Sequence, residues 1–212
     1  MSDKVVEATF EGLLPGQALD KVSPAELNAA AGRSVQSLLV THLTQYNRSH
    51  PNKLGGKRTN WYRQMAEATH LTVTPEQALV SIAHIGARIG ILGGTIYPGV
   101  NASFVSGKPT RLLTIPANAA AHGERAQKFS DRLMMIIFKR QKSSGLVGML
   151  VEKAAVSAKG KPAKKGVMNR IMYWLTGRAT IKPAPDLLPD DKAIEASAYA
   201  GALLLIKRIW AR

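Results

Sequence analysis

The sequence contains no cysteine. This absence excludes disulfide bonds, thiolate metal sites and cysteine nucleophiles together. The chain must therefore hold its fold by core packing or by oligomerisation, and it needs no oxidising compartment. A long apolar run is also missing, since residues 198–206 fall well short of the roughly 20 residues that a membrane-spanning helix needs. The N-terminus has mixed charge and no apolar signal segment, so we expect a soluble protein made in the cytoplasm, without membrane contact.

Acidic residues are scarce. The chain has 14 Asp and Glu against 29 Lys and Arg, which gives a net charge of +15 and a pI near 10.3. Residues 153–185 contain no acidic residue at all. A surface this basic favours nucleic acid, anionic membranes or acidic protein faces as partners, and charge alone does not choose among them.

Recognisable catalytic and metal-binding patterns are absent from the sequence. The five histidines lie far apart, and no pair has the spacing of a zinc protease motif. No serine lies in a Gly-x-Ser-x-Gly elbow. The run Gly55-Gly56-Lys57-Arg58-Thr59 differs from a phosphate-binding P-loop, which requires Ser or Thr directly after the lysine. We therefore predict a protein that is not an enzyme, with no catalytic residues, no cofactor and no bound metal.

Two helices are clearly marked at their ends. Ser23-Pro24-Ala25-Glu26 is a complete capping box, and apolar residues then recur at helical spacing until the pattern fades near Asn47. A second helix begins at Asp190-Asp191 and ends with bases at Lys207 and Arg208, which matches the helix dipole at both ends.

Short strands dominate the region between these helices. A short helix over 60–69 precedes a hairpin formed by 71–74 and 78–83, and the glycine-rich segment 86–94 permits at most a single helical turn. Further strands are expected at 95–97 paired with 111–115, at 133–138 paired with 146–151, and at 171–175. The sequence thus predicts an α+β fold: a mostly antiparallel sheet packed by a long N-terminal helix and a C-terminal helix, with extended loops. We expect a single domain over 1–212, with an N-terminal arm (1–22), loops at 51–58 and 98–109, and a flexible basic loop at 157–166.

Two sets of residues are candidates for contacts with partners. The basic loops offer seven cations that either form a solvated surface or contact the DNA backbone: Lys53, Lys57, Arg58, Lys159, Lys161, Lys164 and Lys165. Four aromatic residues could stack on bases, although such residues more often fill cores and subunit interfaces: Trp61, Tyr62, Trp174 and Trp210.

Several short sequence motifs follow one another between residues 50 and 131. They are Leu-Gly-Gly-Lys-Arg-Thr-Asn at 54–60, a hairpin, Gly-Gly-Thr-Ile at 93–96, Leu-Thr-Ile-Pro at 113–116, and His-Gly-x-Arg at 122–125. In this order and spacing the chain resembles the virion morphogenesis, or tail-completion, family of Mu-like tailed bacteriophages. The resemblance extends more loosely through 173–175 and 188–189. Many relatives carry an aromatic pair before Gly-Gly-Thr-Ile, where this chain has Ile91-Leu92, a conservative departure.

The resemblance implies a structural protein of the head–tail junction of a virion. Such a tail terminator-like subunit forms a homo-oligomeric ring, often of six, that caps the tail tube protein and docks the neck or connector protein. The basic surface suits a non-specific contact with genomic DNA. Two alternatives remain: a basic DNA-binding virion protein that holds the genome end in the neck, or a minor head protein. An enzyme such as a nuclease is a third, and metal-dependent cutting of plasmid DNA would reveal it.

Overall fold

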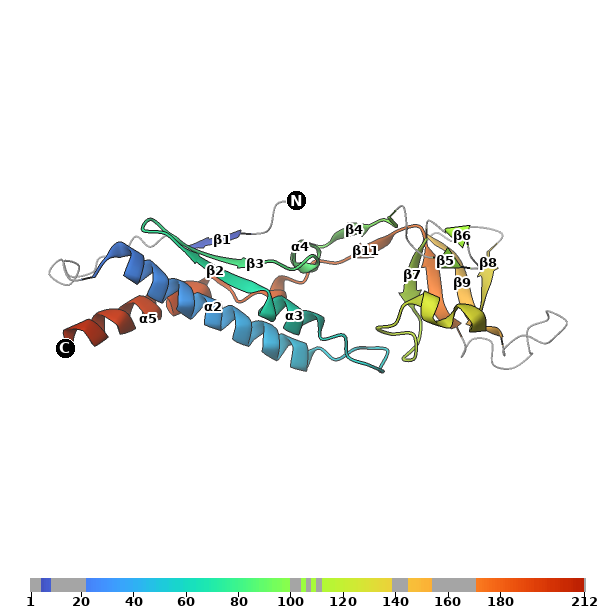
Figure 1. Cartoon of the computed structure of the whole chain (residues 1–212), viewed down its shortest axis with the longest axis horizontal. Coiled ribbons are helices and arrows are strands. Elements are labelled where there is room, and N and C mark those ends of the chain that lie inside the picture. The colour runs from blue at the N-terminus through green and yellow to red at the C-terminus, as the bar shows by residue number, and fades with distance from the viewer. Residues whose placement is uncertain are drawn as a thin grey trace. The chain divides into compact units, whose positions relative to one another are not determined.

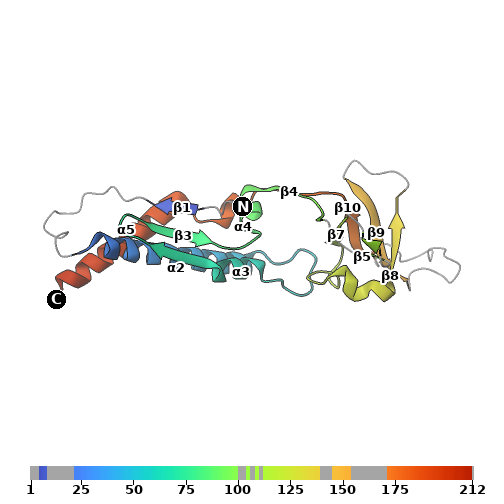
Figure 2. The same cartoon turned by 45° about the horizontal axis from the view of Figure 1, so that its top comes forward.

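The computed structural model describes residues 5–8, 22–99, 104–105, 108–109, 112–138, 145–153 and 171–211 (Figures 1 and 2). It confirms the predicted α+β class, with a long N-terminal helix and a C-terminal helix on antiparallel sheet. The sequence predicts one domain, whereas the structure divides into two compact units. Unit 1 comprises Met1–His50, Asn60–Gly93 and Lys182–Arg212, and unit 2 comprises Pro51–Thr59 and Gly94–Ile181. The chain therefore passes between the units four times.

The long helix α2 (Pro24–Ser49) begins where the capping box predicts. The backbone N–H of Glu26 donates to Ser23 Oγ at 3.3 Å, and the backbone N–H of Ser23 donates to Glu26 Oε2 at 3.0 Å. Hydrogen bonds from Ser23 also lower the pKa of the Glu26 carboxyl. The start of this helix thus follows from local chemistry, because the cap satisfies N–H groups that have no partner inside the helix.

Unit 1 places two helices on one face of a three-stranded antiparallel sheet. The sheet order is β1 (Val5–Ala8), β3 (Ala78–Ile82) and β2 (Thr69–Val73), so the predicted hairpin is confirmed. The strand β1 lies within the segment 1–22, for which the sequence predicts only an arm. Helix α5 (Asp191–Trp210) lies beside α2 (Figure 1), and both contribute to one core cluster: Ala31, Val35, Leu39, Val80, Ile194 and Ala198.

A second cluster of unit 1 gathers short elements around the C-terminal half of α2. These elements are α3 (Trp61–Glu67), α4 (Ala87–Leu92) and the 3₁₀ turn η4 (Pro185–Leu187). Helix α3 is shorter than the predicted helix 60–69 because Thr69 already belongs to strand β2. The cluster contains Leu43, Tyr46, Met65, Ala66, Ile82, Ala87 and Leu187.

Unit 2 is built on a four-stranded antiparallel sheet. Its order is β7 (Leu113–Pro116), β10 (Ile171–Thr176), β9 (Leu146–Glu152) and β8 (Leu133–Ile137). The predicted pairing of 133–138 with 146–151 is confirmed, as is the return of 171–175 to the sheet. Ala126 of the 3₁₀ helix η1 (Ala126–Arg132) joins a core formed with Ala121, Leu133, Leu150, Met172, Tyr173 and Leu175.

The predicted pairing of 95–97 with 111–115 is wrong. Strand β4 (Gly94–Ile96) pairs with β11 (Ala179–Ile181), while β7 pairs with β10. Both true partners lie far along the chain, and no local signal identifies them. The predicted loop 98–109 contains a short strand pair, β5 (Phe104–Val105) and β6 (Lys108–Pro109). The predicted basic loop 157–166 lies outside the described residues.

Candidate interaction surfaces and the polar cluster of α2 and η4

The net positive charge of the protein belongs to one unit. Unit 2 holds 18 Lys and Arg against 3 Asp and Glu, which is a net charge of +15. Unit 1 holds the remaining 11 Lys and Arg against 11 Asp and Glu, so its net charge is zero. A charge asymmetry of this size within one chain is typical of proteins that present one part to a polyanion.

The basic loop formed by residues 51–59 (the 51–59 loop) is fastened to the turn formed by residues 118–124 (the 118–124 turn). Gly56 has a φ of 80°, and a Cβ there would overlap the carbonyl oxygen of Ala119. His122 Nδ1 donates to the carbonyl oxygen of Lys57 at 3.2 Å. The first and last motifs that carry the family resemblance, 54–60 and 122–125, are thus in contact through Lys57 and His122 of unit 2.

The 118–124 turn is itself held by the central strand of the sheet. The Asn118 side chain donates to the carbonyl of Ile171 at 2.8 Å and accepts from the backbone N–H of Ala120 and Ala121. The hydroxyl of Tyr173 donates to the carbonyl oxygen of Glu124 at 3.0 Å. Burial, followed by the charge of Glu124, raises the pKa of Tyr173. The backbone of the basic loop is therefore linked to the core of unit 2 through a continuous set of hydrogen bonds.

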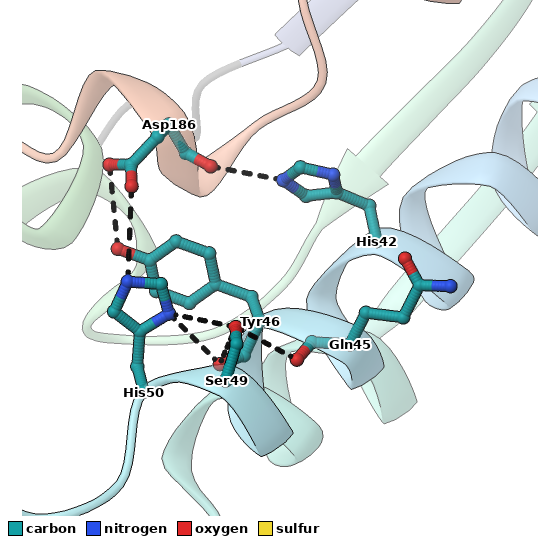
Figure 3. Close-up of polar contacts among 6 residues, drawn as sticks. All are labelled: His42, Gln45, Tyr46, Ser49, His50 and Asp186. Carbon is teal, nitrogen blue, oxygen red and sulfur yellow. Dashed lines mark hydrogen bonds and ion pairs between the residues drawn. The ribbon is translucent and has the colours of Figure 1, made fainter.

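A polar cluster joins the last turns of α2 to η4 (Figure 3). His42 Nε2 donates to the carbonyl oxygen of Asp186 at 3.0 Å. The carboxylate of Asp186 accepts from the hydroxyl of Tyr46 at 3.4 Å and lies 4.0 Å from His50 Nε2. His42, Tyr46 and His50 are four residues apart in turn, so they lie along one face of the helix. We call this set the polar cluster of α2 and η4.

Ser49, His50 and Asp186 have the residue types of a hydrolase triad but not its geometry. His50 Nδ1 lies 3.2 Å from the carbonyl oxygen of Tyr46, which can only accept, so this nitrogen carries the proton. It therefore cannot take a proton from Ser49 Oγ, 3.1 Å away. Ser49 Oγ itself hydrogen-bonds to the carbonyls of Gln45 and Tyr46, at 3.1 and 3.3 Å. The cluster caps the C-terminal end of α2 rather than activating a nucleophile.

Aromatic rings extend this cluster within unit 1. The Tyr46 ring stacks on His50, with centroids 3.8 Å apart and planes at 11°, and meets Tyr62 edge-on at 4.8 Å. The pKa of Tyr46 is raised mainly by burial and then by the charge of Asp186. Burial, followed by Asp186, also raises the pKa of Tyr62. Two of the predicted interface residues, Trp61 and Tyr62, thus pack inside unit 1 and are half-buried.

The Trp61 ring explains the glycines at 86 and 90. A Cβ on Gly86 would overlap Cζ2 of Trp61, and one on Gly90 would lie 3.1 Å from Cδ2 of Leu187 and 3.6 Å from the Trp61 ring. The segment also forms α4 in spite of its glycine content, because these glycines let the indole ring pack directly on the helix backbone.

The other predicted partner residues fall in three places. Lys53, Lys57 and Arg58 are exposed on the 51–59 loop, while Lys159, Lys161, Lys164 and Lys165 lie outside the described residues. Trp174 is half-buried in β10. Trp210, the last residue of α5, is 60% exposed. Tyr199 and Leu204 of the same helix are also exposed, at 58% and 72%.

Two features are not predicted from the sequence. The polar cluster leaves only a weak signal, the spacing of His42, Tyr46 and His50, and nothing near them points to Asp186, which is 140 residues from Tyr46. Of the exposed apolar residues of α5, the sequence predicts only Trp210 as an interface residue. The others are not predicted because the helix is apolar on most of its circumference, so its buried and exposed residues look alike in the sequence.

Within the described residues, no group of three or more His, Asp or Glu side chains is placed to hold a metal ion. None of the helices in the described segments combines the length and apolarity needed to cross a bilayer. Comparisons with family models, curated proteins and solved structures found no match to this chain.

Proposed function

We propose that the chain is a non-enzymatic structural protein of a tailed-phage virion. In this proposal copies of the chain form a ring at the head–tail junction, where the ring terminates the tail tube and docks to the neck or connector. The proposal takes its specific content from the resemblance of residues 50–131 to the tail-completion family.

One observation carries the proposal from the structural side. Two motifs of the resemblance, 54–60 and 122–125, serve packing between distant segments: Gly56 contacts the 118–124 turn, and His122 donates to the carbonyl oxygen of Lys57. None of these contacts presents a free nucleophile, a general base or a set of ligands. A motif whose residues hold loops in place supports an assembly role, since catalysis would need reactive groups around a reacting atom.

Exposed apolar side chains on α5 support self-association. A helix that is apolar on most of its circumference normally lies buried, yet Tyr199, Leu204 and Trp210 are largely exposed in the single chain. Large exposed apolar side chains on one element favour a protein interface. The ring proposed above would cover them with a second copy.

Electron microscopy of particles made without this protein tests the proposal. The gene is disrupted in a phage-producing host and complemented by a plasmid copy, which controls for effects on neighbouring genes. We expect full heads beside separate tails, some of uncontrolled length, and restoration of joined particles by the plasmid copy. Intact infectious particles from the disrupted strain would reject a role at the head–tail junction.

A further inference from the structure

The distribution of charge points beyond an assembly role. We propose that unit 2 binds the phosphodiester backbone of nucleic acid, through the 51–59 loop and the basic side chains of the neighbouring segment 118–132. This inference rests on the charge and geometry of unit 2 and is independent of the proposed place in a virion.

The cations of this surface are exposed and largely unpaired. Lys53, Lys57, Arg58, Arg125 and Arg132 are exposed, and within the described residues none of them lies within ion-pairing distance of a carboxylate. Cations that lack intramolecular partners repel one another, and a polyanion relieves that repulsion.

Two carboxylates lie on the same segment and reduce its charge without cancelling it. Glu124 is occupied by Lys128, whose Nζ lies 3.1 Å from Oε1. Asp131 accepts a hydrogen bond from Ser130, which is the main reason for its lowered pKa, so it remains ionised. Residues 51–59 and 118–132 together hold six Lys and Arg against these two acids, a net charge of +4.

The loop is also preorganised. The close approach of Gly56 to Ala119 and the hydrogen bond from His122 to Lys57 fix the backbone that carries Lys57 and Arg58. A loop that is already ordered loses less conformational entropy when it binds. Lys and Arg on a fixed backbone suit phosphate contacts, which position a protein on nucleic acid without reading its sequence.

The described part of unit 2 fits nucleic acid better than a membrane. Surface-bound proteins insert an amphipathic helix, and the helical element described in unit 2 is the 3₁₀ helix η1. The exposed large apolar residues of unit 2 are scattered over separate elements: Leu54, Ile96, Tyr97, Ile115 and Ile137. Nucleic acid offers the denser anionic partner, with one phosphate per roughly 1.7 Å of duplex axis.

Fluorescence anisotropy with a labelled duplex of arbitrary sequence, measured across a salt series, tests the inference. We expect Lys53→Gln, Lys57→Gln and Arg58→Gln together to weaken binding at least tenfold. The slope of log K against log salt should fall by about 0.9 for each phosphate that the variant no longer neutralises. The matched control changes three exposed cations of unit 1, Arg33→Gln, Arg88→Gln and Lys192→Gln, and should leave affinity and slope unchanged.

Three results would overturn the inference. Equal losses of affinity in the two triple variants would mean that total charge, not this surface, drives binding. Absence of binding to duplex DNA, single-stranded DNA and RNA at low salt, with unchanged circular dichroism, would exclude nucleic acid as the partner. Tighter binding to phosphatidylserine vesicles or to polyglutamate than to the duplex would assign the surface to a membrane or an acidic protein. Single-stranded DNA and RNA probes then identify which nucleic acid is preferred.

Discussion

Gly86 is required by packing because the Trp61 ring occupies the space that a side chain would need. Gly90, one helical turn further along, allows the same ring and Leu187 to approach α4 closely. A glycine-rich segment for which composition predicts at most a single helical turn therefore forms the short helix α4, whose glycines leave room for the Trp61 ring. The cost in backbone entropy is offset by burial of the indole of Trp61 against α4.

Replacing Gly86 with alanine should destabilise unit 1. The added methyl group forces the Trp61 ring to move, and overpacking of this kind costs about 1–3 kcal/mol. Chemical denaturation followed by Trp fluorescence measures the loss. Gly177→Ala is the matched control, since a Cβ there meets nothing within 4 Å. Equal stability of the two variants would show that Trp61 has room to move.

Ionisation of Tyr46 should destabilise the folded protein at high pH. Its pKa is raised in the folded state, chiefly by burial, so folding favours the neutral phenol. The resulting contribution to stability is present below the unfolded pKa of about 10 and is lost as the pH rises through the higher folded value. As the pH rises from the unfolded to the folded pKa of Tyr46, the free energy of unfolding should fall less steeply in Tyr46→Phe than in the wild type.

Denaturation curves at a series of alkaline pH values provide the comparison. Tyr199→Phe, at an exposed position of α5, serves as the control for removing a hydroxyl elsewhere. Parallel pH profiles for Tyr46→Phe and the wild type would contradict the expectation. Tyr62 and Tyr173, whose pKa values are also raised, account for the slope that remains in Tyr46→Phe.

At the scale of the element, helix α5 combines buried and exposed apolar residues. Ile194 and Ala198 pack against α2 and β3, and a Cβ on Gly201 would come within 2.6 Å of the carbonyl oxygen of Ala30. Away from these contacts α5 carries three large apolar side chains that are mostly exposed, Tyr199, Leu204 and Trp210. Substitutions of the exposed residues of α5 should therefore change self-association, and substitutions of its buried residues should change the free energy of unfolding.

Leu204→Ser with Trp210→Ser should weaken self-association while leaving the free energy of unfolding nearly unchanged. Each side chain would lose about 2 kcal/mol of apolar burial at an interface, which weakens association more than tenfold. Sedimentation equilibrium measures the effect, with the exposed Ala200→Ser as the control. The same mass distribution for all three proteins would place the contact between copies elsewhere.

At the scale of the whole molecule, the two units differ in both core and charge. Unit 1 has its own clusters around Leu39 and Leu43, and unit 2 has one around Leu150 and Tyr173. All of the net charge belongs to unit 2. This separation lets one unit carry assembly contacts and the other carry a polyanion, as the two proposals require.

Removing buried atoms from one core should loosen that unit first. Leu39→Ala is expected to cost about 2–5 kcal/mol, because Leu39 is almost fully buried in unit 1. Hydrogen–deuterium exchange should then accelerate in α2, β3 and α5 while β9 and β10 keep their protection. Leu150→Ala, in the core of unit 2, should produce the reverse pattern. Uniform acceleration in both variants would mean that the two units unfold as one.

The features that depend on near neighbours can be predicted from the sequence. The capping box at Ser23, the acidic start of α5, the hairpin of β2 and β3, and the excess of positive charge are all legible in the chain, because each rests on residues within a few positions or on composition. Three features are known only from the folded chain: the pairing of β4 with β11, the contact of Asp186 with Tyr46, and the location of all the net charge in unit 2. These depend on which distant apolar surfaces are buried together, and burial is not directional, so no local pattern specifies it.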